Sequence, residues 1–388
     1  MEGIQAYLIG REDAPLLKRE LLGHPVESYA RQALEDAGIR EITPLMTADE
    51  RAALADLLRG AESPKALFLR ADAPCVEPES LVAMCAQASQ NQDEVFTIVT
   101  PGTQTALAMC ADRTLLLRAL GDEPFGTLQE LLAVLSERDV HLRAIPVRDP
   151  ARCVAADSPA GYAAAHAILR KAFLQKHLQA GVLILDPERT IIEADVQIGP
   201  GTMIYPGNLL MGKTVIGASC TLYQNNRLQN ASVGDDTTVE SSVLLDCAVG
   251  AGTTVGPYAY VRPQSNIGDG CRIGDFVEIK NSKIGNGTKV SHLTYVGDSD
   301  LGRDINLGCG VVFVNYDGKV KSRSTVEDHA FIGCNCNLVA PVRVGENAYI
   351  AAGSTITEDV PGNALYVARS RGVTKENWVL RRKEQGKL

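Results

Sequence analysis

The stretch VGAGTTVGPYAYVRPQSNIGDGCRIGDFVEIKNSKI (residues 249–284) decides the fold of the C-terminal part of this chain. Neither the 3.6-residue period of an α-helix nor the two-residue period of a β-strand produces its spacing. A six-residue repeat, often with Gly after the aliphatic residue, is typical of a parallel β-helix whose units form the sides of triangular coils. The aliphatic residues that recur at every sixth position are Val249, Val255, Val261, Ile267, Ile273 and Ile279.

The same spacing reaches far beyond this stretch. It runs from Ile192 to Leu228 and again from Val326 to Ile356. We therefore expect a left-handed β-helix with a C-terminal tail over residues 181–388. The repeat breaks between Phe313 and Val326, where the polar run NYDGKVKSRST predicts a loop that projects from the coils.

Residues 1–180 show a different pattern, in which short apolar runs alternate with helical periodicity. This alternation predicts an α/β domain with a mostly parallel sheet and an exit helix. The expected strands are residues 6–9, 65–69 and 95–100, and the expected helices are residues 26–38, 77–90 and 158–179.

Composition narrows the classes of function. The 388 residues include 38 Lys and Arg against 47 Asp and Glu, a formal net charge of -9, with no dominant basic cluster. A nucleic-acid partner, which requires clustered positive charge, is therefore not expected. No apolar stretch is long enough to span a bilayer and the N-terminus does not resemble a signal peptide, so we expect a soluble cytoplasmic protein with no membrane partner.

The coil geometry brings two cations together. Arg262 and Lys280 directly follow the inward residues Val261 and Ile279, one coil apart, so both point outward and lie one above the other. Two stacked cations are well suited to hold a phosphate between them. Two solvated side chains that splay apart would also fit this spacing.

A second column contains His292, Cys309, Cys334 and Ala352, each two residues after an inward position. The three small residues leave a shallow groove that fits an extended chain such as a pantetheine arm. Imidazole, with an unperturbed pKa of about 6.5, is mostly neutral at cytoplasmic pH and can accept a proton from a nucleophile. An exposed corner histidine with no role is the alternative that spacing leaves open.

The C-terminal half resembles one family in particular. GPYAYVRP (256–263), KVSHLTYVGD (289–298) and YIAAGSTIT (349–357) are similar, in order and spacing, to the acetyltransferase domain of the bifunctional N-acetylglucosamine-1-phosphate uridyltransferase/glucosamine-1-phosphate acetyltransferase family. The resemblance implies acetyl-CoA-dependent N-acetylation of glucosamine 1-phosphate on the pathway to UDP-N-acetylglucosamine and the cell wall. It also implies a homotrimer that acts on small-molecule substrates.

The resemblance further implies roles for individual residues. His292 would be the general base, with Glu278 and Asn306 orienting the reacting groups. The amino-sugar phosphate would be bound by Arg262, Lys280, Tyr295 and Lys321. Acetyl-CoA would be bound by Cys309, whose backbone N–H would stabilise the oxyanion, and by Asn315, Tyr316, Cys334, Ala352 and Arg369.

The N-terminal half follows its counterpart less closely. LLGHPVESYARQALEDAGI (21–39) and LFLRADAPCVEPESL (67–81) resemble sugar-phosphate nucleotidyltransferases, and the second contains their metal-binding Asp, here Asp72. The glycine-rich phosphate loop is replaced by YLIGREDAPLLKREL, which keeps only Gly10. We therefore expect a shortened, degenerate nucleotidyltransferase-like domain that has lost uridyl transfer and binds no metal; Mg²⁺ at Asp72 would be needed only if that activity were retained.

Two other functions remain open at this stage. The chain could be a bifunctional enzyme that still transfers uridyl groups from UTP. It could also be a non-catalytic regulatory protein whose α/β domain binds a sugar nucleotide.

Overall fold

The computed structural model describes every residue except 2, 12, 47–52 and 121–126. The described residues form two compact units: residues 1–176 with 192–195, and residues 177–191 with 196–388. No helix in the described part of the chain has the length and apolar character needed to cross a membrane.

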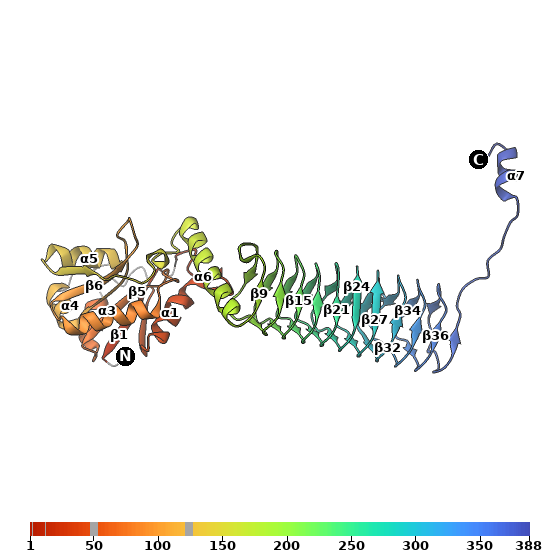
Figure 1. Ribbon diagram of the computed structural model, residues 1–388, viewed down its shortest axis with the longest axis horizontal. Coiled ribbons are helices and arrows are strands. Elements are labelled where there is room, and N and C mark those ends of the chain that lie inside the picture. Colours follow the sequence, from red (N-terminus) through yellow and green to blue (C-terminus); the bar gives the residue numbers. More distant parts are fainter. Residues whose placement is uncertain (2, 12, 47–52, 121–126) are drawn as a thin grey trace. The chain divides into compact units, whose positions relative to one another are not determined.

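The first unit is an α/β domain built on a six-stranded, mostly parallel sheet (Figure 1). The strand order is β4 (Glu41–Leu45), β1 (Ile4–Ile9), β5 (Lys65–Arg70), β7 (Ala106–Asp112), β6 (Glu94–Val99) and β8 (His141–Ala144). The helices are α1 (Val26–Asp36), α2 (Ala53–Gly60), α3 (Pro78–Gln90), α4 (Arg113–Leu120), α5 (Leu128–Glu137) and α6 (Pro159–Gln179), and a short hairpin pairs β2 (Glu20–Leu21) with β3 (His24–Pro25).

The central strands of this domain are apolar on both faces. In β5 the run KALFLR is buried at every residue but the last, as expected for a strand that helices cover on both sides. Tyr7 stacks on Phe68 with ring centroids 5.0 Å apart and fixes the register of β1 against β5. The predicted α/β class is confirmed, with one addition: β7 is antiparallel to both of its neighbours.

The second unit is a parallel β-helix with three long sheets of ten, nine and eleven short strands (Figure 1). The sheets run from β10 (Ile191–Ile192) to β37 (Thr355–Ile356), from β11 (Gln197–Ile198) to β35 (Arg343–Val344), and from β9 (Leu183–Ile184) to β38 (Leu365–Tyr366). Every pairing within them is parallel, and the inward residues Val255, Ile273, Val290 and Leu307 are stacked in register and buried. The predicted fold class, a β-helix of hexapeptide repeats after an α/β domain, is confirmed.

Adjacent coils are held together at their corners by side chains as well as by strand pairing. The backbone N–H of Ala251 donates to Asp269 at 2.8 Å, and the N–H of Asp269 donates to Asn286 at 2.9 Å, each from one coil to the next. A Cβ at Gly268 would lie 2.9 Å from the backbone nitrogen of Asn286. This close approach explains why Gly so often follows the inward residue.

The strands around the candidate site come from two of the three sheets. On the first lie β24 (Arg272–Asp275), β27 (Lys289–His292), β30 (Asn306–Leu307), β33 (Phe331–Ile332) and β36 (Tyr349–Ile350). On the second lie β22 (Tyr260–Val261), β25 (Glu278–Lys280), β28 (Tyr295–Gly297), β31 (Val312–Val314) and β34 (Asn337–Val339).

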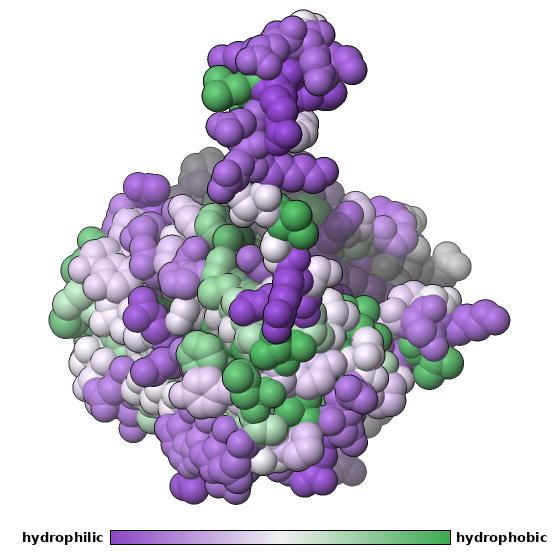
Figure 2. Space-filling view, turned by 90° about the vertical axis from the view of Figure 1, so that its right-hand side faces the viewer, coloured by the Kyte–Doolittle hydropathy of each residue, from purple (hydrophilic) through white to green (hydrophobic). Residues whose placement is uncertain are grey.

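Two segments lie outside the regular coils. The predicted loop between β31 and β32 (Ser324–Val326) is present, and an isolated bridge pairs Tyr316 with Lys321 inside it. The C-terminal tail ends in the exposed helix α7 (Trp378–Glu384), whose last turn carries three basic residues. Hydrophilic residues dominate its surface in Figure 2.

Candidate active site

The candidate site lies along one corner of the coils, where the chain passes from β27 to β28. His292 is the last residue of β27, and its imidazole is 52% exposed. Because β24, β27, β30, β33 and β36 are neighbours in one sheet, the residues two positions after each inward residue form a column. The coil register therefore places His292, Cys309, Cys334 and Ala352 in one row along this corner, as the spacing predicts.

Asp275, which sequence reasoning missed, is the hydrogen-bond partner of His292. It is the last residue of β24, lies directly opposite His292 in the register, and contacts the imidazole Nδ1 through Oδ1. The hydrogen bond from His292 holds the pKa of Asp275 below its usual range. The carboxylate is therefore charged at neutral pH and accepts the Nδ1 proton, which leaves Nε2 to act as a base. The spacing of 17 residues, one coil, was the available signal.

Arg262 already forms an ion pair with a carboxylate of the chain. Its guanidinium donates from Nη1 to Glu278 Oε1 at 2.8 Å and lies over the ring of Tyr260, 5.7 Å from the centroid. Tyr295 lies opposite Glu278 on the next coil. Three of the predicted residues, Arg262, Glu278 and Tyr295, are thus brought together on one sheet.

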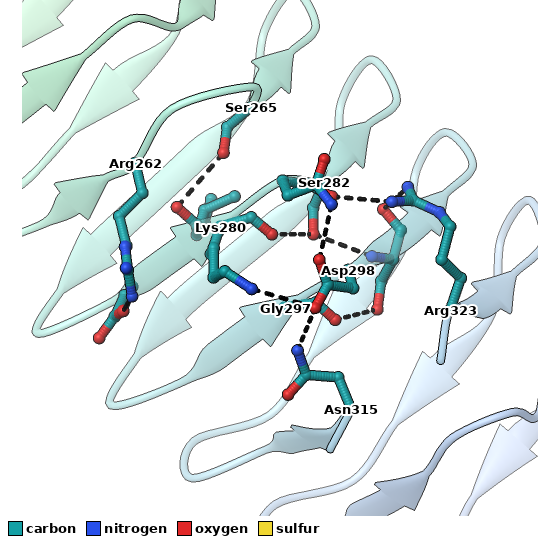
Figure 3. Close-up of polar contacts among 12 residues, drawn as sticks. Arg262, Ser265, Lys280, Ser282, Gly297, Asp298, Asn315 and Arg323 are labelled. Carbon is teal, nitrogen blue, oxygen red and sulfur yellow. Dashed lines mark hydrogen bonds and ion pairs between the residues drawn. The ribbon is translucent and has the colours of Figure 1, made fainter. Parts of the chain in front are cut away.

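Lys280 also has a partner within the chain, Asp298 (Figure 3). The Lys280 Nζ lies 3.1 Å from Asp298 Oδ2, Asn281 donates to Oδ1 at 2.6 Å, and Asn315 donates to Oδ2. Burial alone would raise the pKa of Asp298, but hydrogen bonds from Asn281, Asn315 and Lys280 outweigh it and hold the pKa below its usual range. Asp298, which sequence reasoning also missed, therefore links a predicted substrate residue to a predicted coenzyme residue.

The projecting loop is anchored at its base by Arg323. The guanidinium pairs with both carboxylate oxygens of Asp300, at 2.7 and 3.1 Å, and Nη1 donates to the backbone oxygen of Asn281 at 3.0 Å. Lys321 and Tyr316, both predicted site residues, are exposed in the loop, and the Tyr316 hydroxyl donates to the oxygen of Gly318. The base of the loop is thus tied to the coils, whereas Tyr316 and Lys321 are exposed to solvent.

The groove above His292 presents backbone donors. Within the residues described, the N–H groups of Cys309, Cys334 and Ala352 donate to no acceptor in the chain, unlike the amides of Ala251 and Asp269 at another corner. The missing acceptor has a simple cause: the residues stacked above Cys309 lack a carboxylate or amide side chain.

Arg369 and Asn306 are two further predicted site residues of the β-helix. Arg369, in the tail, donates from Nη1 to the backbone oxygen of Ala352 and so lies beside the upper end of the groove. Asn306 points outward from β30 and makes no hydrogen bond to His292 or Glu278 among the described contacts. The structure thus joins Arg369 to the column and shows no hydrogen bond between Asn306 and the histidine among the described residues.

In the α/β domain, Asp72 lies just after the end of β5. Both of its carboxylate oxygens accept hydrogen bonds from Arg70, at 2.8 and 2.7 Å. The carboxylate that would hold Mg²⁺ only if uridyl transfer were retained is therefore already engaged by a cation of the chain.

Comparisons with known proteins match this architecture. The chain matches the family model described as bacterial transferase hexapeptide (six repeats) over residues 246–281 and 323–358. The matched segments lie in the β-helix, and the second begins at Arg323, in the base of the projecting loop.

More specifically, the chain is a relative of the bacterial proteins named bifunctional protein GlmU. It is 56% identical over 212 residues to the protein of Clostridium acetobutylicum, which is 55% of this chain and 46% of that protein. It is 49% identical over 255 residues to the protein of Clostridium novyi, which is 66% of this chain and 56% of that protein. The chain thus spans about half the length of the curated relatives it matches.

Two solved structures are similar to parts of this chain. A nucleotidyl transferase from Methanothermobacter has 19% identity and a TM-score of 0.36, covering 45% of this chain and 100% of its own. A UDP-N-acetylglucosamine acyltransferase from Arabidopsis has 16% identity and a TM-score of 0.26, covering 52% of this chain and 77% of its own.

Proposed function

We propose that the β-helix transfers an acetyl group from acetyl-CoA to the amine of glucosamine 1-phosphate, forming N-acetylglucosamine 1-phosphate for the synthesis of UDP-N-acetylglucosamine. The observation that carries this proposal is the hydrogen-bonded pair of Asp275 and His292 at the foot of a groove of small residues with free backbone donors. The similarity to the bifunctional GlmU proteins supports the same substrates.

The proposed proton transfer uses the two ring nitrogens of His292 in different roles. Asp275 holds Nδ1–H, so Nε2 of His292 accepts a proton from the sugar amine as the amine nitrogen attacks the thioester carbonyl carbon. The carbon–sulfur bond then breaks, and coenzyme A leaves as the thiolate, which the same proton neutralises. The N–H of Cys309 would donate to the developing oxyanion.

The substrate phosphate would bind to Arg262 and Lys280, each of which also pairs with a carboxylate of the protein. Arg262 is held by Glu278 and Lys280 is held by Asp298, so both are positioned before the phosphate arrives. A preorganised cation loses less side-chain entropy on binding than a freely moving one. Glu278 and Asp298 thereby act as positioning residues, and Tyr295 and Lys321 would complete the contacts.

We also propose a homotrimer with acetyl-CoA contacts from Asn315, Tyr316, Cys334 and Arg369, as the resemblance implies. Flat sides of a coil pack well against symmetry-related copies. Sedimentation of the purified protein tests this assembly, and a species of monomer mass at assay concentration would contradict it.

The decisive experiment measures thiol release from acetyl-CoA with and without glucosamine 1-phosphate. We expect release that depends on the amino sugar and falls about 10²- to 10⁴-fold in His292→Ala, the contribution of a general base. The matched control is His329→Ala, a corner histidine outside the column. A His292→Ala protein with the wild-type rate would exclude the proposal.

A further inference from the structure

The α/β domain contains a cavity of about 500 Å³ at the carboxyl ends of β1 and β5. Asp72, Asp157 and the segment after Ile9 line it. This edge of a parallel sheet is where α/β proteins generally bind ligands. The resemblance to nucleotidyltransferases implies Mg²⁺ at Asp72, and the side chains around the cavity can be tested for their fit to such an ion.

The position between the two acidic residues is taken by Arg70. Its guanidinium donates from Nε and Nη2 to the two oxygens of Asp72, at 2.8 and 2.7 Å, and from Nη2 to Asp157 at 2.9 Å. The backbone N–H of Ala156 donates to the backbone oxygen of Asp72 at 2.7 Å. This bond holds the segment that carries Asp157 close to the end of β5. The two carboxylates thus converge on one cation, and that cation belongs to the chain.

A divalent ion does not fit this arrangement. It would need carboxylate oxygens that Arg70 already uses, and it would lie close to a permanent positive charge in a partly buried site, where repulsion is stronger than in water. The Arg70 side chain is only 20% exposed, so it has little freedom to swing into solvent. Across the described residues, no group of three or more acidic, cysteine or histidine side chains is arranged to hold a metal.

The segment after β1 is equally unsuited to a chain of phosphates. The N–H of Gly10 donates to the oxygen of Leu45 at 3.0 Å, and the N–H of Ala14 donates to the oxygen of Arg11 at 3.0 Å, so these amides point back into the chain. A Cβ at Gly10 would meet side-chain atoms of Ala71 and Leu17, at 3.1 and 3.2 Å. Side chains thus pack against Gly10 on the side where a Cβ would lie, and the two amides are already paired within the chain.

We propose that the Arg70 guanidinium takes the place of a divalent cation between Asp72 and Asp157, so that this cavity binds neither Mg²⁺ nor a magnesium-bound nucleoside triphosphate. One permanent positive charge then lies between the two carboxylates, and any ligand of the cavity binds without a metal. This inference concerns the α/β domain alone and does not depend on the proposed acetyl transfer.

Titration of the full-length protein with Mn²⁺, followed by electron paramagnetic resonance, tests the proposal. The wild type and Asp72→Asn should bind the same amount of Mn²⁺. Arg70→Met, which keeps an unbranched apolar side chain but removes the guanidinium and its charge, should gain one bound ion, and Arg70→Met/Asp72→Asn should lose it again. Calorimetric titration of the wild type with magnesium-bound UTP should show no binding.

Two outcomes would overturn the inference. One is Mn²⁺ binding by the wild type that Asp72→Asn or Asp157→Asn abolishes. The other is a folded Arg70→Met protein, judged by circular dichroism, that gains no ion. If Arg70→Met does not fold, the comparison of the wild type with Asp157→Asn still decides the question, because Asp157 is 51% exposed and its replacement leaves the Arg70–Asp72 pair in place.

Discussion

Replacing Asp275 with Asn tests whether the carboxylate orients the base. The change keeps the size of the side chain but removes the charge that fixes Nδ1–H of His292. The loss must be smaller than that for removing the base, which is about 10²- to 10⁴-fold, because Nε2 can still accept a proton in part of the population. The Asp275 side chain is also 35% exposed, so water replaces part of the lost interaction.

We therefore expect kcat to fall about 10- to 100-fold in Asp275→Asn, with little change in KM for acetyl-CoA, as is typical when the partner of a functional histidine is removed. The assay is thiol release at saturating glucosamine 1-phosphate. Asp269→Asn is the matched control, because Asn286 already fills the equivalent corner position one coil further on. If Asp275→Asn keeps kcat within about twofold of the wild type while His292→Ala is inactive, the orienting role is wrong.

Two further substitutions and one labelling experiment test the residues around His292. Asp298→Asn should lower the free energy of unfolding by about 1–3 kcal/mol in urea, because Lys280 loses its charged partner. The pKa of Asp298 in the folded protein lies below its unfolded value of about 3.9. The stabilisation by this carboxylate is therefore complete above about pH 4 and is lost as the pH falls through the folded pKa. On acidification below pH 4, the wild type should lose more stability than Asp298→Asn. Lys280→Ala should raise KM for glucosamine 1-phosphate about 10- to 100-fold, and Lys283→Ala should not; equal KM values would contradict the phosphate contact. Cys334, the exposed thiol among ten free cysteines, should react first with a thiol reagent and be protected by acetyl-CoA, and unchanged reactivity would place the coenzyme elsewhere.

The β-helix was predictable because its signal is local and repetitive. Once Val290 and Leu307 are recognised as inward residues, coil stacking fixes which side chains share a column, and the register agrees. The α/β sheet was predictable only in class. The antiparallel strand β7 is as apolar as the strands beside it. Such a run of residues does not show whether its strand will be parallel or antiparallel.

The candidate site was predictable in position but not in its ion pairs. The spacing placed Arg262 above Lys280, but it could not show that Glu278 and Asp298 reach each of them. Asp298 follows a strand by one residue, and its contact with Lys280 depends on a corner conformation with a positive φ of 48°. Asn and Asp favour such a conformation, but which partner a corner side chain reaches depends on the neighbouring coils.

The register of the coils also limits how this part of the molecule can change length. Insertion or deletion of one complete coil would keep the register of the coils that follow, whereas a shift of one residue would turn inward aliphatic side chains outward along every strand that follows. Shorter insertions are accepted only between strands, and the loop between β31 and β32 occupies such a position. A β-helix of this kind can therefore become longer or shorter in whole coils outside those that carry Asp275, His292, Cys309, Cys334 and Ala352 without disturbing this corner.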